Sequence, residues 1–225
     1  ILKAYQYQEI SIMDVGQENA IAVLQAISSI YSSLVRFDPA KIPAQVIDAD
    51  AAEKWSSSPD GLVWTFTLRQ GLKFHDGTPA TSADVAFSFN RAINPPQGVK
   101  SPLRDLFATI KSIETPDPTT VTITLKRPVG WFMPLLVTQS ASILPKHLLE
   151  KNPNAFVRTA VGTGPFKLKR FTPSVSVEVE RNPDYHMKGY PYLDGVTTLI
   201  IPDAATRLAA FRTHQGSITG VAGAS

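Results

Sequence analysis

The sequence contains no cysteine. This absence excludes disulfide bonds, zinc sites built from cysteine and catalysis by a thiol nucleophile. The sequence also has no run of about 18 apolar residues, the length that a membrane-spanning helix needs. Its first residues lack the basic stretch and apolar core of a signal peptide, so an exported protein would already have lost that peptide.

Basic runs are absent as well. The net charge is only +3 and the isoelectric point about 9.1. The densest basic cluster consists of Lys167, Lys169 and Arg170. A nucleic-acid-binding protein usually shows a basic stripe or an aromatic-basic motif. We therefore predict that this protein does not bind nucleic acid.

Catalytic and metal-binding patterns are missing too. The sequence has neither a G-x-S-x-G elbow nor an H-E-x-x-H pair. The four histidines are far apart in the chain: His75, His147, His186 and His214. We interpret His75 as an exposed strand end, Asp76 as a turn residue, and Asp48 and Asp50 as solvated residues of a connector. These interpretations predict no metal, no cofactor and no catalytic activity.

What the sequence does have is enough material for a core. Its 225 residues can form one large or two small domains, and 43% are hydrophobic while 18% are charged. The most regular stretch is 61–92. Trp64, Phe66 and Leu68 alternate with polar residues, which predicts a half-buried strand with Trp64 in the core.

A capped helix follows that strand. Asp76-Gly77 is a turn signal. Thr81 with Asp84 three residues later predicts a helix N-terminus. The helix should end before Pro95-Pro96.

Several further elements are predicted from periodicity and turn residues. The expected strands cover 1–8, 110–114, 121–125, 165–168, 175–179 and 196–201. The expected helices cover 18–33, 131–137 and 204–213, the last capped by Asp203, and one more helix begins with Pro145 at its first position. A loop of several residues should join 110–114 to 121–125.

The stretch GLVWTFTLRQGLKFHDGTPATSADVAFSFNRA resembles the signature of the family 5 extracellular solute-binding proteins, the dipeptide-, oligopeptide- and nickel-binding receptors of ABC importers. Three further segments resemble the same family. Residues 30–39 are similar to its IYEGLVRFDP, with Ser32 and Ser33 in place of Glu-Gly. Residues 162–167 are similar to its GTGPYK, and 181–186 to its RNPxYW with His186 replacing the aromatic residue.

The resemblance implies an α/β fold of the class II periplasmic-binding-protein type, with mixed sheets and flanking helices. It implies that 1–36 and 162–225 belong to ligand-binding lobe I and that 37–161 form an inserted subdomain. The chain resembles only the N-terminal half of the family, so the C-terminal lobe is absent from it.

The resemblance also implies a function. The expected protein is a monomeric periplasmic or extracytoplasmic receptor that captures a small molecule or peptide. It delivers this ligand to the permease subunits of an ABC importer, and through the permease it can associate with the membrane. The family pattern points to Asn19, Ala20 and Ile21, and to Leu103, as ligand contacts. Two alternatives stay open: a secreted hydrolase with its catalytic residues in the missing half, or a sensory or interaction domain that reuses the receptor fold.

Overall fold

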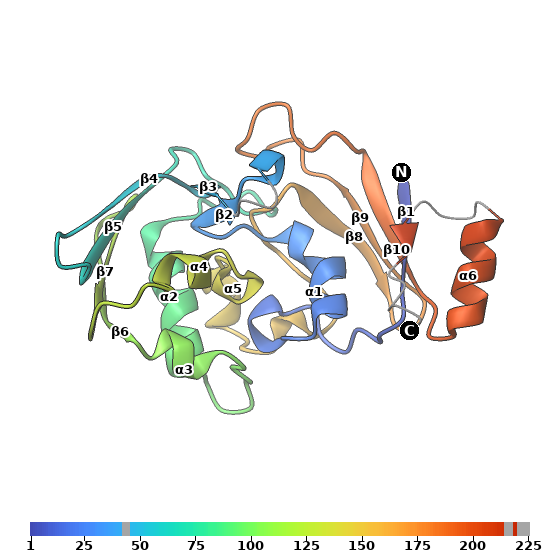
Figure 1. Ribbon diagram of the computed structural model, residues 1–225, viewed down its shortest axis with the longest axis horizontal. Coiled ribbons are helices and arrows are strands. Elements are labelled where there is room, and N and C mark those ends of the chain that lie inside the picture. Colours follow the sequence, from blue (N-terminus) through green and yellow to red (C-terminus); the bar gives the residue numbers. More distant parts are fainter. Residues whose placement is uncertain (42–45, 214–217, 220–225) are drawn as a thin grey trace.

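The computed structural model describes residues 1–41, 46–213 and 218–219 and contains three sheets (Figure 1). The strands are β1 Leu2–Gln6, β2 Val35–Phe37, β3 Ile47–Ala49, β4 Ala52–Ser57, β5 Val63–Leu68, β6 Ile110–Asp117, β7 Thr120–Leu125, β8 Phe166–Thr172, β9 Ser176–Arg181, β10 Gly195–Ile200 and β11 Ile218–Thr219. The α-helices are α1 Ile21–Ile27, α2 Ser82–Ile93, α3 Arg104–Phe107, α4 Phe132–Leu136, α5 Lys146–Leu149 and α6 Ala204–Arg212. This arrangement confirms the predicted α/β class with mixed sheets and flanking helices.

The five-stranded sheet joins the two ends of the described chain. Its order is β11-β1-β10-β9-β8. Strand β1 runs parallel to both β10 and β11, while β10, β9 and β8 follow one another antiparallel. Because parallel neighbours require a crossover, the whole middle of the chain lies between β1 and its partner β10.

The four-stranded sheet is antiparallel, in the order β4-β5-β7-β6. Phe66 and Leu68 on β5 are fully buried, whereas Trp64 on the same face is half-buried and stacks on Phe132 with 5.6 Å between ring centroids. Helix α2 contributes Val85 and Phe89 to this core. The Asp84 carboxylate accepts the Thr81 backbone N–H at 2.9 Å, which confirms the predicted helix start.

Two hydrophobic cores result, one beside each large sheet. The first contains residues from Leu34 to Ile143. The second combines residues 10–31 with residues 144–200, so the segment 144–160 packs beside the five-stranded sheet. Figure 1 shows the two large sheets at opposite ends of the molecule, with α1, α2, α4 and α5 between them.

Gly162 and Gly164 mark the place where the chain returns to the five-stranded sheet. A Cβ on Gly162 would lie 2.1 Å from the Ile30 carbonyl oxygen, and one on Gly164 would lie 2.5 Å from the Ile30 carbonyl carbon. The Gly164 N–H donates to that same oxygen at 3.0 Å. Only glycine allows two backbones to approach this closely.

Among the predicted elements whose bounds differ in the structure, three differ for a clear local reason. The helix expected over 18–33 is only α1 followed by a 3-10 turn at Ser28–Ile30, since Ala20 is extended and Tyr31 turns back to extended backbone. The loop expected after 114 is a tight turn, because the Asp117 carboxylate accepts the backbone N–H groups of Thr119 and Thr120 at 2.8 and 2.9 Å. Pro145 is the N-cap of α5, with ψ at 104°, and not its first helical residue.

Candidate functional site

A polar hollow on the described surface lies between the loops that precede α1 and α3. Its volume is about 410 Å³. Gln17, Glu18 and Asn19 line it from the first loop, and Lys100 and Pro102 line it from the second. Asn154, from the segment after α5, completes the polar lining.

One glutamine side chain holds the two loops together. The Lys100 backbone N–H donates to Gln17 Oε1 at 2.9 Å, and Gln17 Nε2 donates to Asp14 Oδ2 at 2.9 Å. Gln17 is buried. Because buried amides need partners on both sides, this side chain fixes the distance between the two walls of the hollow.

A buried ion pair between Asp14 and Arg91 stabilises the loop before α1, which forms one wall of the hollow. Arg91 Nη2, on α2, contacts Asp14 Oδ2 at 2.6 Å, and the side chains are only 4% and 1% exposed. The same nitrogen donates to the Pro153 carbonyl oxygen at 3.0 Å, beside Asn154. Removal of either partner would leave an unpaired buried charge. The pair therefore joins three segments that lie far apart in the sequence at the base of the hollow.

Glu18 shapes the rim of the hollow and the start of α1. Its Oε1 accepts the backbone N–H groups of Asn19 and Ala20 at 2.8 and 2.9 Å. These bonds keep both residues out of the helix, which begins at Ile21. With Lys100 on the opposite wall, the rim carries one carboxylate, one ammonium group and several amides. Such a surface suits a small ligand with charges of both signs.

The four predicted contact residues lie in different surroundings. Asn19 is exposed and lines the hollow, and Ala20 is half-buried next to it. Ile21 is 74% exposed, and Leu103 packs on the first core. The loops that carry them do come together, but whether these residues contact a ligand stays a prediction.

Sequence reasoning missed the residues that build most of the lining. Gln17 and Glu18 lie one or two positions before the predicted Asn19, and Lys100 lies three positions before the predicted Leu103, so the lining residues and the predicted residues share two loops. Nothing in the sequence around Asn154 indicated that it would meet these loops.

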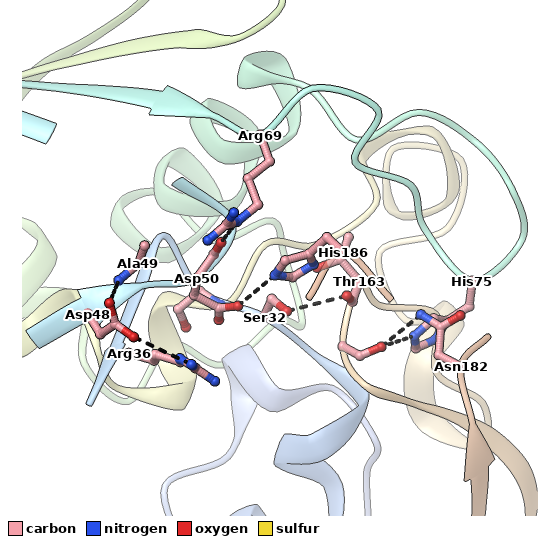
Figure 2. A network of polar contacts seen from close by, with 12 residues as sticks. Ser32, Arg36, Asp48, Ala49, Asp50, Arg69, His75, Thr163, Asn182 and His186 are labelled. Carbon is pink, nitrogen blue, oxygen red and sulfur yellow. Dashed lines mark hydrogen bonds and ion pairs between the residues drawn. The ribbon is translucent and has the colours of Figure 1, made fainter. Parts of the chain in front are cut away.

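A second polar network joins the two halves of the fold near Gly164 (Figure 2). His75 Nε2 donates to the Gly164 carbonyl oxygen at 3.0 Å, and the Gly162 N–H donates to His75 Nδ1 at 3.3 Å. Burial lowers the pKa of His75 from 6.5 to about 4, with Gly164 opposing and Lys167 reinforcing that shift. The expectation that His75 is an exposed strand end was therefore wrong: it is a neutral, partly buried ring that fixes the returning chain.

Asp50 also differs from its expected environment. It is only 6% exposed. Its carboxylate accepts the Ser33 N–H at 3.0 Å and His186 Nε2–H at 3.0 Å (Figure 2). The prediction of a solvated connector was wrong for Asp50 because His186, which satisfies it, lies 136 positions away. Asp48, by contrast, is half-exposed.

Within residues 1–41, 46–213 and 218–219, no group of three or more His, Asp or Glu side chains is placed to hold a metal ion. His214 lies outside these residues. Asp76 accepts the Thr78 N–H at 3.0 Å, as expected for a turn, and also pairs with His147 at 2.8 Å. No helix in the described part of the chain is long and apolar enough to cross a membrane.

The chain is similar to known proteins over most of its length. The family model described as bacterial extracellular solute-binding proteins, family 5 Middle, matches residues 47–224. The glutathione-binding protein GsiB of Salmonella typhi is 36% identical over 164 residues, which are 73% of this chain and 32% of that protein.

Solved structures show the same likeness. The binding protein AgaA of A. tumefaciens R10, in complex with agropinic acid, superposes with a TM-score of 0.89 at 33% identity, over 96% of this chain and 43% of that one. The periplasmic binding protein DppA of Helicobacter pylori, in complex with the peptide STSA, gives 0.87 at 32% identity, over 97% and 46%. The chain thus spans less than half the length of these relatives.

Proposed function

The chain belongs to the bacterial extracellular solute-binding proteins of family 5, and on that premise we propose that it forms one wall of a receptor that captures a small solute outside the cytoplasmic membrane for an ABC importer. The observation that carries the proposal is the polar hollow between the loops before α1 and α3, braced by the buried Asp14–Arg91 pair. A rigid, preformed wall suits capture of a ligand without bond chemistry. The receptor is a monomer that meets the membrane through the permease.

The proposed ligand is a peptide or a similar small zwitterion. Glu18 and Lys100 both line the hollow, so it offers each sign of charge once. We assign Glu18 Oε2 to a cationic ligand group, since the two backbone hydrogen bonds of that carboxylate use Oε1. The names of the relatives support this class, because they bind glutathione, agropinic acid and a peptide.

The proposed mechanism is closure of a second wall over the hollow. We assign 1–36 and 162–225 to the ligand-binding lobe and 37–161 to the inserted subdomain, of which 144–160 pack in the core of the lobe. The polar network around Gly164 lies between the two parts. An open hollow of about 410 Å³ leaves one side of a ligand in water. Sites of this kind bury roughly 70–90% of the ligand surface, so a partner wall is required for tight binding.

The test begins with the full chain and the molecule that co-purifies with it, identified by mass spectrometry. Calorimetry with that molecule should show binding weakened about tenfold or more by Glu18→Gln and by Lys100→Met, because each removes a charged hydrogen-bond partner. Lys151→Met, an exposed lysine outside the hollow, is the matched control and should bind as the parent does. Unchanged affinity in both test variants would refute the assignment of the hollow. Turnover of the molecule by the parent protein would favour a hydrolase instead.

A further inference from the structure

A second hollow, unrelated to the first, lies beside the segment that joins β9 to β10. Its volume is about 250 Å³. Arg36 is its one charged lining residue, and the other lining residues are aromatic or apolar, chiefly Phe166, Tyr185, Tyr190, Tyr192 and Leu193. It shares no lining residue with the first hollow. In Figure 1 the β9–β10 segment lies at the top, whereas the loops before α1 and α3 lie at the bottom.

Hydrogen bonds of Arg181 and Asn182 fix the segment that forms this hollow. Arg181 Nη2 donates to the Tyr192 carbonyl oxygen at 3.0 Å and pairs with Asp194 at 2.9 Å. On the other side, the Asn182 N–H donates to the Pro165 carbonyl oxygen at 2.9 Å. Both ends of the segment are therefore anchored, and a preformed site loses little conformational entropy when it binds.

Two rings of this hollow, those of Tyr190 and Tyr192, are exposed. Tyr192 is 77% exposed and Tyr190 42%, and their centroids are 4.9 Å apart. Leu193, the residue after Tyr192, is 39% exposed. Clustered exposed apolar side chains around a concavity are typical of binding sites. The tyrosine faces suit a flat ring, which they can contact by offset or edge-to-face stacking.

Arg36 adds a positive charge at the edge of the aromatic wall. Its Nη2 contacts Asp48 Oδ2 at 3.4 Å, and its buried Nε has no acceptor among the described residues. A distance of 3.4 Å exceeds the usual range for a charge-assisted hydrogen bond. Arginine normally binds a carboxylate through two parallel bonds. The guanidinium group therefore retains donors for a further anion.

We propose that this aromatic hollow is a binding site for a small aromatic carboxylate, whose ring stacks on Tyr190 and Tyr192 and whose carboxylate pairs with Arg36. A volume of about 250 Å³ lies below the usual 300–1,000 Å³ of sites for drug-sized ligands, so a single-ring molecule fits. Asp48 is the nearest competing anion. The site is separate from the solute hollow and its occupancy does not depend on the transported ligand.

Benzoate is the probe, and benzyl alcohol is its uncharged counterpart. Titrated into the full chain and followed by ligand-observed NMR, benzoate should bind with a dissociation constant of roughly 1 mM, as expected for a ligand of so few atoms. Arg36→Met should weaken benzoate binding about tenfold and leave benzyl alcohol unaffected. Tyr192→Ala should weaken both probes, because it removes a stacking surface from an exposed position where folding is not at risk.

Asp48→Asn gives a test with the opposite sign. The substitution removes the carboxylate that competes for Arg36, so benzoate should bind about threefold more tightly. The Ala49 N–H, which donates to Asp48 Oδ1 at 2.8 Å, can donate to the asparagine amide oxygen instead. Arg170→Met, an exposed arginine paired with Glu178 on β8, is the matched control and should change nothing. The proposal is overturned if benzoate does not bind, or if it binds equally to the parent, Arg36→Met and Asp48→Asn. These outcomes leave the solute hollow untouched, since Glu18 and Lys100 are unaltered.

Discussion

Gly164→Ala should loosen the contact that joins the returning chain to the 3-10 turn after α1. The added Cβ would lie 2.5 Å from the Ile30 carbonyl carbon and 2.6 Å from both the Ser29 oxygen and the Tyr31 nitrogen. All three are backbone atoms, which cannot rotate away as a flexible side chain can. The two segments must therefore separate by about 1 Å to reach ordinary van der Waals contact.

The cost has two parts. Overpacking of this kind destabilises by roughly 1–3 kcal/mol. Separation would also stretch the hydrogen bonds that Gly164 makes with Ile30, His75 and Asn182, at 3.0, 3.0 and 2.9 Å. At about 0.5–1.5 kcal/mol each, partial loss of these three raises the total to roughly 3–5 kcal/mol.

Thermal unfolding followed by circular dichroism measures the effect. A chain of this length should lose about 2–4 °C per kcal/mol, so we expect the melting temperature to fall by roughly 6–20 °C. The matched control is Gly130→Ala, because a Cβ at Gly130 meets nothing within 4 Å and should change stability by less than about 1 kcal/mol. If Gly164→Ala and Gly130→Ala had the same melting temperature, the close approach at Gly164 would not contribute to stability and the reasoning would be refuted.

Three further predictions concern buried groups. Arg91→Met should cost about 3–5 kcal/mol in urea unfolding because Asp14 would stay buried without its partner, and a loss below 1 kcal/mol would contradict the account. The pKa of His75 is lowered to about 4 in the folded protein, so on acidification the unfolded chain protonates this ring before the folded protein does. The free energy of unfolding should therefore fall by at most about 3 kcal/mol between pH 7 and pH 4. His75→Gln should flatten that part of the curve of stability against pH. Trp64→Ala should cost about 3 kcal/mol, since the ring packs on Phe132; a variant that keeps its melting temperature but loses ligand would show that Trp64 is a contact residue.

The sequence was most informative where structure depends on neighbours in the chain. The alternation around Phe66 and the capping pair Thr81–Asp84 depend on residues at most four positions apart, and both are present as predicted. The helix cap at Asp203 is also confirmed, with its carboxylate accepting the Thr206 N–H at 2.7 Å. Local propensity and capping chemistry explain these successes.

Predictions failed where a residue depends on a distant partner. Asp50 is buried because His186 and Ser33 satisfy its carboxylate. His75 is partly buried because its ring bonds to Gly162 and Gly164, 87 and 89 positions away. The base of the candidate site depends on Arg91, which meets Asp14 across 77 positions. No local pattern encodes such a pairing, so only the fold reveals it.

Hydrogen–deuterium exchange of the full chain, with and without its co-purified ligand, tests the central claim most directly. If the polar hollow is the ligand wall, slowed exchange should appear in the loops at 17–20 and 98–102. The Lys100 backbone N–H is already bonded across the rim to Gln17, and the Ala20 N–H is bonded to Glu18 within its own loop. The segment 185–193 should exchange at the same rate in both states. Protection confined to 185–193, or absent from both rim loops at saturating ligand, would contradict the account.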